Sequence, residues 1–165
     1  PPGYKVVANI PYYLTSNLVR TLSESTNPPQ KVVLLIQKEV AERIAAQPGS
    51  MSLLSVTAQF FWKVSLNIVV PARLFTPPPK VDSQVIILEQ LPGTLFPDVD
   101  SKSFFRLVKA GFSARRKTIE NSLSGGLALK KPEVKELLAK ADIPSAARPQ
   151  TLSMQDWHRL YQATI

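Results

Sequence analysis

The chain has 165 residues, of which 44% are hydrophobic and 19% are charged, a composition typical of one ordinary globular domain or two small lobes. It has no cysteine and a single histidine (His158), which excludes disulfides and thiolate or multi-histidine metal sites. No apolar run is long enough to span a bilayer, and the sequence shows no signal-peptide layout. The net charge of +8 is uneven: residues 1–100 hold 8 Lys and Arg against 7 Asp and Glu, and residues 101–165 hold 12 against 5, which favours a second half that binds a polyanion.

The first forty residues predict a strand, a helix and a second strand. Residues 5–9 and 31–37 are short apolar runs rich in β-branched residues, which is typical of buried strands. Residues 16–24 place apolar side chains at helical spacing, with Thr15 or Ser16 as the expected cap. A strand, helix and strand in about thirty residues form a βαβ unit, so the two strands should be parallel.

The rest of the chain changes from sheet to helix. Helices are expected at 38–46 and 53–61, followed by strands at 63–70 and 84–88 that a rigid loop containing Pro77, Pro78 and Pro79 joins in an antiparallel arrangement. Residues 91–100 read as a linker. Helices are then expected at 101–112, 115–123, 132–141 and 153–163. The pattern predicts an α/β part over residues 1–95 and a basic helical domain over residues 100–165.

The motif Asn9-Ile10-Pro11-Tyr12 stands directly after the first strand, where ligands bind in open α/β sheets. An exocyclic amino group of a nucleobase is a poor nucleophile because its lone pair is delocalised into the ring. The Asn9 carboxamide and the Pro11 carbonyl could accept its two hydrogens and aim the nitrogen for in-line attack on a methyl group. Tyr12 could stack on the base. The same four residues could also form an ordinary loop turn.

Phe75 stands before the triple-proline loop and offers a second aromatic platform for a base drawn out of a stack or from an RNA loop. In isolation it could equally be a core aromatic that anchors a proline-rich connection.

Several long motifs, taken together, resemble those of ribosomal RNA adenine dimethyltransferases. They occur in the family's order at 9–16, 37–43 and 75–83. The segment 112–123 is similar to the C-terminal domain of the universal small-subunit enzymes, and the resemblance covers nearly the whole chain. It implies the C-terminal part of a Rossmann-like class I methyltransferase sheet followed by a small all-helical domain. It also implies dimethylation of N6 on two adjacent adenosines near the 3′ end of small-subunit rRNA, with S-adenosylmethionine as donor. By that match Asn9 lies between donor and target, Pro11 orients the amino group, and Tyr12 and Phe75 hold the base.

Candidate RNA contacts are basic residues of both parts. Arg115, Arg116 and Lys117 are expected to open a helix, where three cations oppose the helix dipole unless an anion is nearby. A solvated basic turn is the other interpretation. Lys38, Arg43 and Lys80 are weaker candidates near the cleft, since Lys80 could be a solvated loop residue and Arg43 could pair with Glu39 or Glu42.

The methyl-donor half of the family's fold is not apparent in this sequence. The six glycines, at 3, 49, 93, 111, 125 and 126, form no Gly-rich turn after a strand. The chain is therefore expected to be a fragment that lacks the main donor site and is inactive alone, with an uncovered sheet edge and face.

Two other functions stay open. One is a non-catalytic RNA-binding module that acts in small-subunit assembly or is related to the mitochondrial transcription factors that share this fold. The other is a large-subunit rRNA resistance dimethyltransferase. The segment 115–123 favours the small-subunit type over this alternative. The expected partner is small-subunit rRNA or the pre-30S particle. We expect a cytoplasmic, monomeric protein that binds neither a metal nor a membrane.

Overall fold

The computed structural model describes residues 1–165, which form two compact units. The first comprises residues 1–45 and 57–95, and the second comprises residues 46–56 and 96–165. The segment 46–56 is tied to the second unit by backbone hydrogen bonds: the N–H groups of Gly49 and Met51 donate to the Gln150 carbonyl at 2.9 and 3.1 Å. No helix in either unit is long and apolar enough to cross a membrane.

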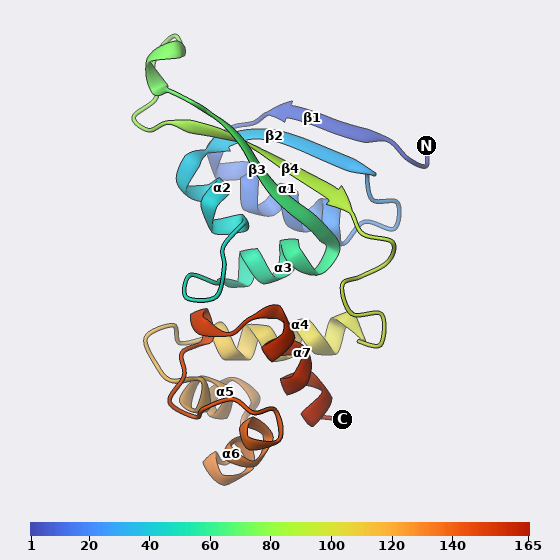
Figure 1. The fold of residues 1–165 in the computed structure, drawn as a ribbon, viewed down its shortest axis with the longest axis vertical. Coiled ribbons are helices and arrows are strands. Elements are labelled where there is room, and N and C mark those ends of the chain that lie inside the picture. The colour runs from blue at the N-terminus through green and yellow to red at the C-terminus, as the bar shows by residue number, and fades with distance from the viewer. The chain divides into compact units, whose positions relative to one another are not determined.

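A four-stranded sheet with the order β1-β2-β4-β3 is the centre of the first unit (Figure 1). Its strands are β1 (Lys5–Asn9), β2 (Lys31–Gln37), β3 (Trp62–Val70) and β4 (Ser83–Gln90). β1 and β2 are parallel and are joined through α1 (Thr15–Ser23), while β4 is antiparallel to both β2 and β3. The predicted βαβ unit and the antiparallel pair are therefore confirmed.

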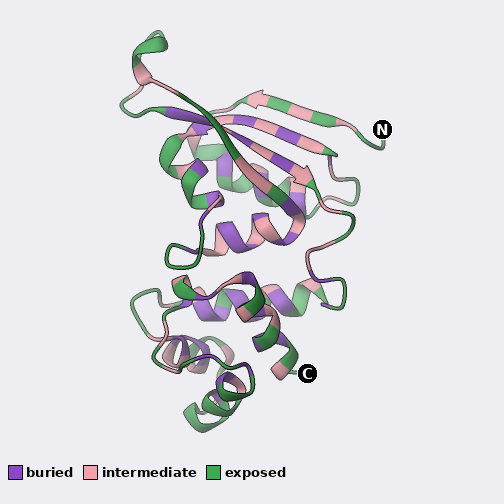
Figure 2. Cartoon of the chain, viewed as in Figure 1, coloured by how far each residue is buried: buried purple, intermediate pink, exposed green.

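Helices pack on one face of this sheet. α1, α2 (Lys38–Ile44) and the second half of α3 (Leu53–Phe61) lie on the same side of it in Figure 1. Val32, Leu34 and Ile36 point to that side and are fully buried, and the alternation along β2 is visible in Figure 2. Alternate residues of a strand point to opposite faces, so a continuous apolar run supplies side chains to both.

The opposite face of the sheet is apolar but carries no helix (Figure 1). Val33, Leu35, Val85 and Ile87 lie in register on this face and are only half-buried. Their neighbour on β1, Val7, is 79% exposed, and β1 pairs with a strand on one side only. An unpaired strand edge beside an apolar face is a surface that favours association with further polypeptide.

The second unit contains the first turn of α3 and four complete helices. The four helices are α4 (Ser101–Phe112), α5 (Ile119–Leu127), α6 (Lys131–Lys140) and α7 (Met154–Ala163). Trp157 of α7 and Phe104 of α4 are fully buried in its core. α4 and α5 approach closely at Gly126, where an added Cβ would lie 2.7 Å from the Ala110 Cα.

The start of α5 and the cap of α1 differ from the sequence prediction. α5 begins at Ile119, not at residue 115, because Thr118 is its N-cap and accepts the Asn121 N–H. α1 is capped by neither Thr15 nor Ser16, because the 3₁₀ turn η1 (Tyr12–Leu14) leads directly into it and Leu14 occupies the cap position without a side-chain bond.

Candidate functional site

Three sequence motifs converge at one edge of the sheet. β1 and β2 are parallel, so Asn9 and Gln37 end at the same edge, and the antiparallel β4 begins there at Ser83. Gln37 is paired directly with Ser83, and the Lys38 N–H donates to the Asp82 carbonyl at 3.0 Å. Three segments therefore lie together at the carboxyl ends of the parallel strands: the box after β1, the start of α2 and the end of the proline-rich loop.

Asn9 and Pro11 stand at this edge on the short connection from β1 to α1. Asn9 is the last residue of β1 and is exposed. The Pro11 carbonyl accepts the Leu14 N–H at 3.0 Å, which closes the η1 turn and holds that carbonyl in one direction. A carbonyl oxygen has two lone pairs, so one acceptor site is still available on Pro11.

Tyr12 is tied to the start of β4 by a hydrogen bond across 71 residues of sequence. Its hydroxyl lies 2.6 Å from the Ser83 hydroxyl, and Ser83 is fully buried whereas Tyr12 is half-buried. The bond limits rotation of the phenol and leaves part of the ring accessible. Sequence reasoning gave Ser83 no role, although it belongs to the 75–83 motif.

The proline-rich connection is organised around Asp82. The Asp82 carboxylate accepts the Ala72 N–H at 2.9 Å, and the Phe75 N–H donates to the Ala72 carbonyl at 3.1 Å. These bonds fix the 3₁₀ turn η2 (Ala72–Leu74) that positions Phe75, which is half-buried. The structure shows no ring contact between Phe75 and Tyr12, and the η2 turn before Phe75 projects away from the sheet in Figure 1, so the two expected platforms are not brought together here.

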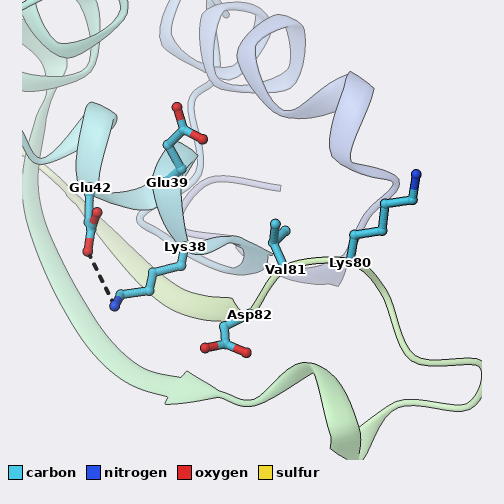
Figure 3. A pocket seen from close by; sticks show the side chains of 6 residues that line it. All are labelled: Lys38, Glu39, Glu42, Lys80, Val81 and Asp82. Atoms are coloured by element: carbon cyan, nitrogen blue, oxygen red, sulfur yellow. Dashed lines mark ion pairs between the residues drawn. The ribbon is translucent and has the colours of Figure 1, made fainter.

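A shallow cavity of about 370 Å³ lies beside this edge (Figure 3). Lys38, Glu39 and Glu42 of α2 line one side, and Lys80, Val81 and Asp82 line the other. Lys38 pairs with Glu42 at 3.8 Å, and Arg43 pairs with Glu39 at 3.2 Å. The alternative interpretation of Arg43, an ion pair within its helix, is therefore confirmed. Lys80 extends away from the other cavity residues in Figure 3 and forms no ion pair.

Arg115, Arg116 and Lys117 occupy the turn between α4 and α5, and all three are exposed. The expectation that they open a helix against its dipole was wrong, since the helix starts after them. The turn is held from beneath: the Ser122 hydroxyl donates to the Ala114 carbonyl at 3.1 Å, and the Lys117 N–H donates to the same carbonyl at 2.8 Å. The result is an anchored loop that presents three cations without an ion-pair partner.

His158 takes part in a local contact rather than a metal cluster. Its ring stacks on Phe96 at a centroid distance of 4.1 Å, and its Nε2 lies 2.9 Å from an Asp98 carboxylate oxygen. This hydrogen bond is the main reason that the pKa of Asp98 lies below its ordinary value. No group of three or more His, Asp or Glu side chains gathers as a metal site.

Comparison with known proteins gives consistent matches over the whole chain. The family model described as "Ribosomal RNA adenine dimethylase" matches residues 2–164. The ribosomal RNA small subunit methyltransferase A of Dehalococcoides mccartyi is 43% identical over 157 residues, which cover 95% of this chain and 54% of that protein. The Enterococcus faecalis protein of the same name is 40% identical over 164 residues, covering 96% of this chain and 56% of that protein. The chain thus spans about half the length of these relatives.

Solved structures give the same fold. A dimethyladenosine transferase from Plasmodium falciparum matches with a TM-score of 0.76 at 25% identity, covering 97% of this chain and 66% of that one. The 23S rRNA methyltransferase ErmE matches with a TM-score of 0.72 at 24% identity, covering 99% of this chain and 66% of that one. The sheet is therefore of the Rossmann-like class I methyltransferase type, and the predicted fold class is confirmed.

Proposed function

This chain belongs to the ribosomal RNA adenine dimethylase family, and on that premise we propose that it supplies the target-base half of an enzyme that dimethylates N6 of two adjacent adenosines near the 3′ end of small-subunit rRNA during ribosome biogenesis. The observation that carries the proposal is the box Asn9–Tyr12 at the carboxyl edge of the sheet, tied to the 75–83 motif by the Tyr12–Ser83 hydrogen bond. The small-subunit relatives support the choice of rRNA.

In this proposal Asn9 and Pro11 prepare the adenine amino group. The exposed Asn9 carboxamide oxygen accepts one amino hydrogen, and the remaining lone pair of the Pro11 carbonyl accepts the other. Two acceptors favour a tetrahedral nitrogen whose lone pair is free to attack. The Ile10 carbonyl, one residue nearer to Asn9, is the competing acceptor because the Pro11 carbonyl already bonds within its turn.

Tyr12 and Phe75 hold the base in the same proposal. Tyr12 presents a ring whose rotation the Ser83 hydroxyl limits, and such an ordered platform loses little entropy when a base stacks on it. In this proposal Phe75, which follows a turn that Asp82 fixes, stacks on the other side of the base. No ring contact between the two has to be broken to admit the base.

We propose that the residues of this chain do not form the main binding site of S-adenosylmethionine, which supplies the methyl group in this family. Gly93 turns with a positive φ shortly after β4, but it is a single glycine and not a Gly-rich turn. Gly3 precedes β1, Gly49 lies in a loop, and the other three glycines lie within helices. The nearby acids Glu39 and Glu42 are paired with cations of their own helix. These observations support the proposal, in which Asn9 is the one candidate contact of this chain with the donor. Donor binding at micromolar concentration by the 165-residue chain in calorimetry would contradict this.

We propose that the loop of Arg115, Arg116 and Lys117 binds rRNA, since three exposed cations without partners suit a phosphate backbone. Lys80 is a secondary candidate. Lys38 and Arg43 are weaker ones, because ion pairs with Glu42 and Glu39 already offset their charges.

The direct test substitutes Asn9→Ala at the corresponding position of a full-length relative, such as the E. faecalis protein. We expect methylation of small-subunit rRNA to slow at least a hundredfold, or about 2.7 kcal/mol, while RNA affinity stays within twofold. Asn17→Ala, at an exposed position on α1, is the matched control and should leave the rate unchanged. An Asn9→Ala rate within twofold of wild type would refute the amino-group role, and methylation of large-subunit rRNA instead would refute the substrate.

A further inference from the structure

The exposed face of α4 consists only of hydrogen-bond donors and hydroxyls. Its exposed residues are Lys102, Ser103, Arg106 and Lys109. The three cations follow the i, i+4, i+7 spacing of a single helical face, with a rise of about 6 and 4.5 Å between successive positions. We call these four residues the α4 donor face.

Some cations of other helices are paired within their own helix, although Lys131 and Lys135 of α6 form no ion pair. On α2, Lys38 pairs with Glu42 and Arg43 with Glu39, and on α6, Lys140 pairs with Glu136 at 3.0 Å. Such i, i+4 pairs are typical of a solvated helix surface. α4 has no acidic residue in its sequence, and its three cations form no ion pair.

Lys102 adds a second unusual feature. It is the second residue of α4, where the positive end of the helix dipole disfavours a cation. The nearest acid in sequence, Asp100, is the N-cap and uses its carboxylate to accept the Ser103 N–H at 2.9 Å. The Ser103 hydrogen bonds lower the pKa of Asp100 most, and attraction between Asp100 and the charge of Lys102 lowers it further, but Asp100 and Lys102 form no ion pair. An external anion would add to this attraction.

We propose that the α4 donor face is a second rRNA-binding surface, separate from the loop of Arg115–Lys117, and that it contacts a run of backbone phosphates. The inference rests on the proposed function, which makes rRNA the substrate. Phosphate contacts need donors and positive charge and no apolar anchor. Protein partners and membranes need exposed apolar side chains, and α4 has none: Phe104 and Leu107 are buried and Phe105 and Phe112 are half-buried.

The test compares two triple variants of the 165-residue chain, each lowering the net charge from +8 to +5. One replaces the α4 cations (Lys102→Gln, Arg106→Gln and Lys109→Gln). The matched control replaces three exposed cations of α6 (Lys131→Gln, Lys135→Gln and Lys140→Gln). Binding to a small-subunit rRNA transcript is measured by filter retention across a series of KCl concentrations, after circular dichroism has shown that both variants keep their helix content.

We expect the α4 variant to bind at least tenfold more weakly and to reduce the slope of log affinity against log salt by about 2 to 3, since each lost phosphate contact removes about 0.7 to 0.9. The α6 variant should change affinity less than threefold. Equal effects of the two variants would mean that only net charge matters and would overturn the proposal. Retained rRNA binding by the α4 variant, with lost binding to vesicles of anionic phosphatidylglycerol, would overturn it in favour of a membrane surface.

A third variant separates this inference from the proposed function. If replacing Arg115, Arg116 and Lys117 with Gln weakens rRNA binding while the α4 variant does not, the α4 inference fails and the proposed function stands. If the wild-type chain shows no salt-dependent rRNA binding, both fail.

Discussion

The hydrogen bond between Tyr12 and Ser83 joins the two motifs of the site and offers the sharpest test of its geometry. Tyr12→Phe removes one hydroxyl and leaves that of Ser83, which is fully buried, without its partner at 2.6 Å. An unsatisfied buried hydroxyl costs about 1–3 kcal/mol. Ser83→Ala should cost less, about 0.5–1.5 kcal/mol, because the half-buried Tyr12 hydroxyl can turn to water.

The double variant should be at least as stable as Tyr12→Phe alone, because removing Ser83 Oγ also removes the orphaned group. The expected coupling energy is therefore about 1 kcal/mol or more. The coupling energy is measured by urea unfolding, with Trp62 fluorescence as the signal. Trp157 is replaced by Phe in all variants, because Trp62 belongs to the first unit and Trp157 to the second. With a slope of roughly 1–3 kcal/mol per molar urea, Tyr12→Phe should lower the midpoint by about 1 M. Effects that add within about 0.3 kcal/mol would show that Ser83 does not hold the Tyr12 ring.

Three further predictions concern packing, pH and association. Gly126→Ala should destabilise the second unit by about 1–3 kcal/mol in thermal melts, because the new Cβ would lie 2.7 Å from α4. Gly125→Ala, whose Cβ would meet nothing within 4 Å, should instead stabilise by about 0.5–1 kcal/mol, so equal losses would refute the close-packing argument. The lowered pKa of Asp98 means that its bond to His158 contributes stability above the ordinary Asp pKa, roughly 3.9, and loses it as pH falls through the folded-state pKa. Asp98→Asn should therefore flatten the decline of Tm between about pH 5 and pH 3, and an unchanged slope would contradict this assignment. Val7→Lys on the unpaired strand should reduce self-association in sedimentation experiments, and unchanged sedimentation would show that this edge is not the contact.

Local patterns were sufficient for much of the fold. The strands at 5–9 and 31–37 and the helices at 53–61 and 101–112 have the predicted bounds, because apolar periodicity reports which side chains must be buried. The position of the Asn9 box followed from the same pattern, since a residue that ends a parallel strand stands at the ligand-binding edge. The residues of the catalytic proposal could thus be named without coordinates.

Other features depend on residues that are distant in sequence or on one hydrogen bond among several. Tyr12 and Ser83 are 71 residues apart, and nothing local in either motif indicates their bond. The start of α5 depends on whether Thr118 or an earlier residue caps the helix, and helix propensity does not distinguish these positions. For the box Asn9-Ile10-Pro11-Tyr12, the sequence indicated the functional groups and their position at the end of β1. Pairing of β4 with β2 brings Ser83, the residue that orients Tyr12, to the same edge. Pairing across a sheet depends on the fold of the whole unit, which short-range patterns do not encode.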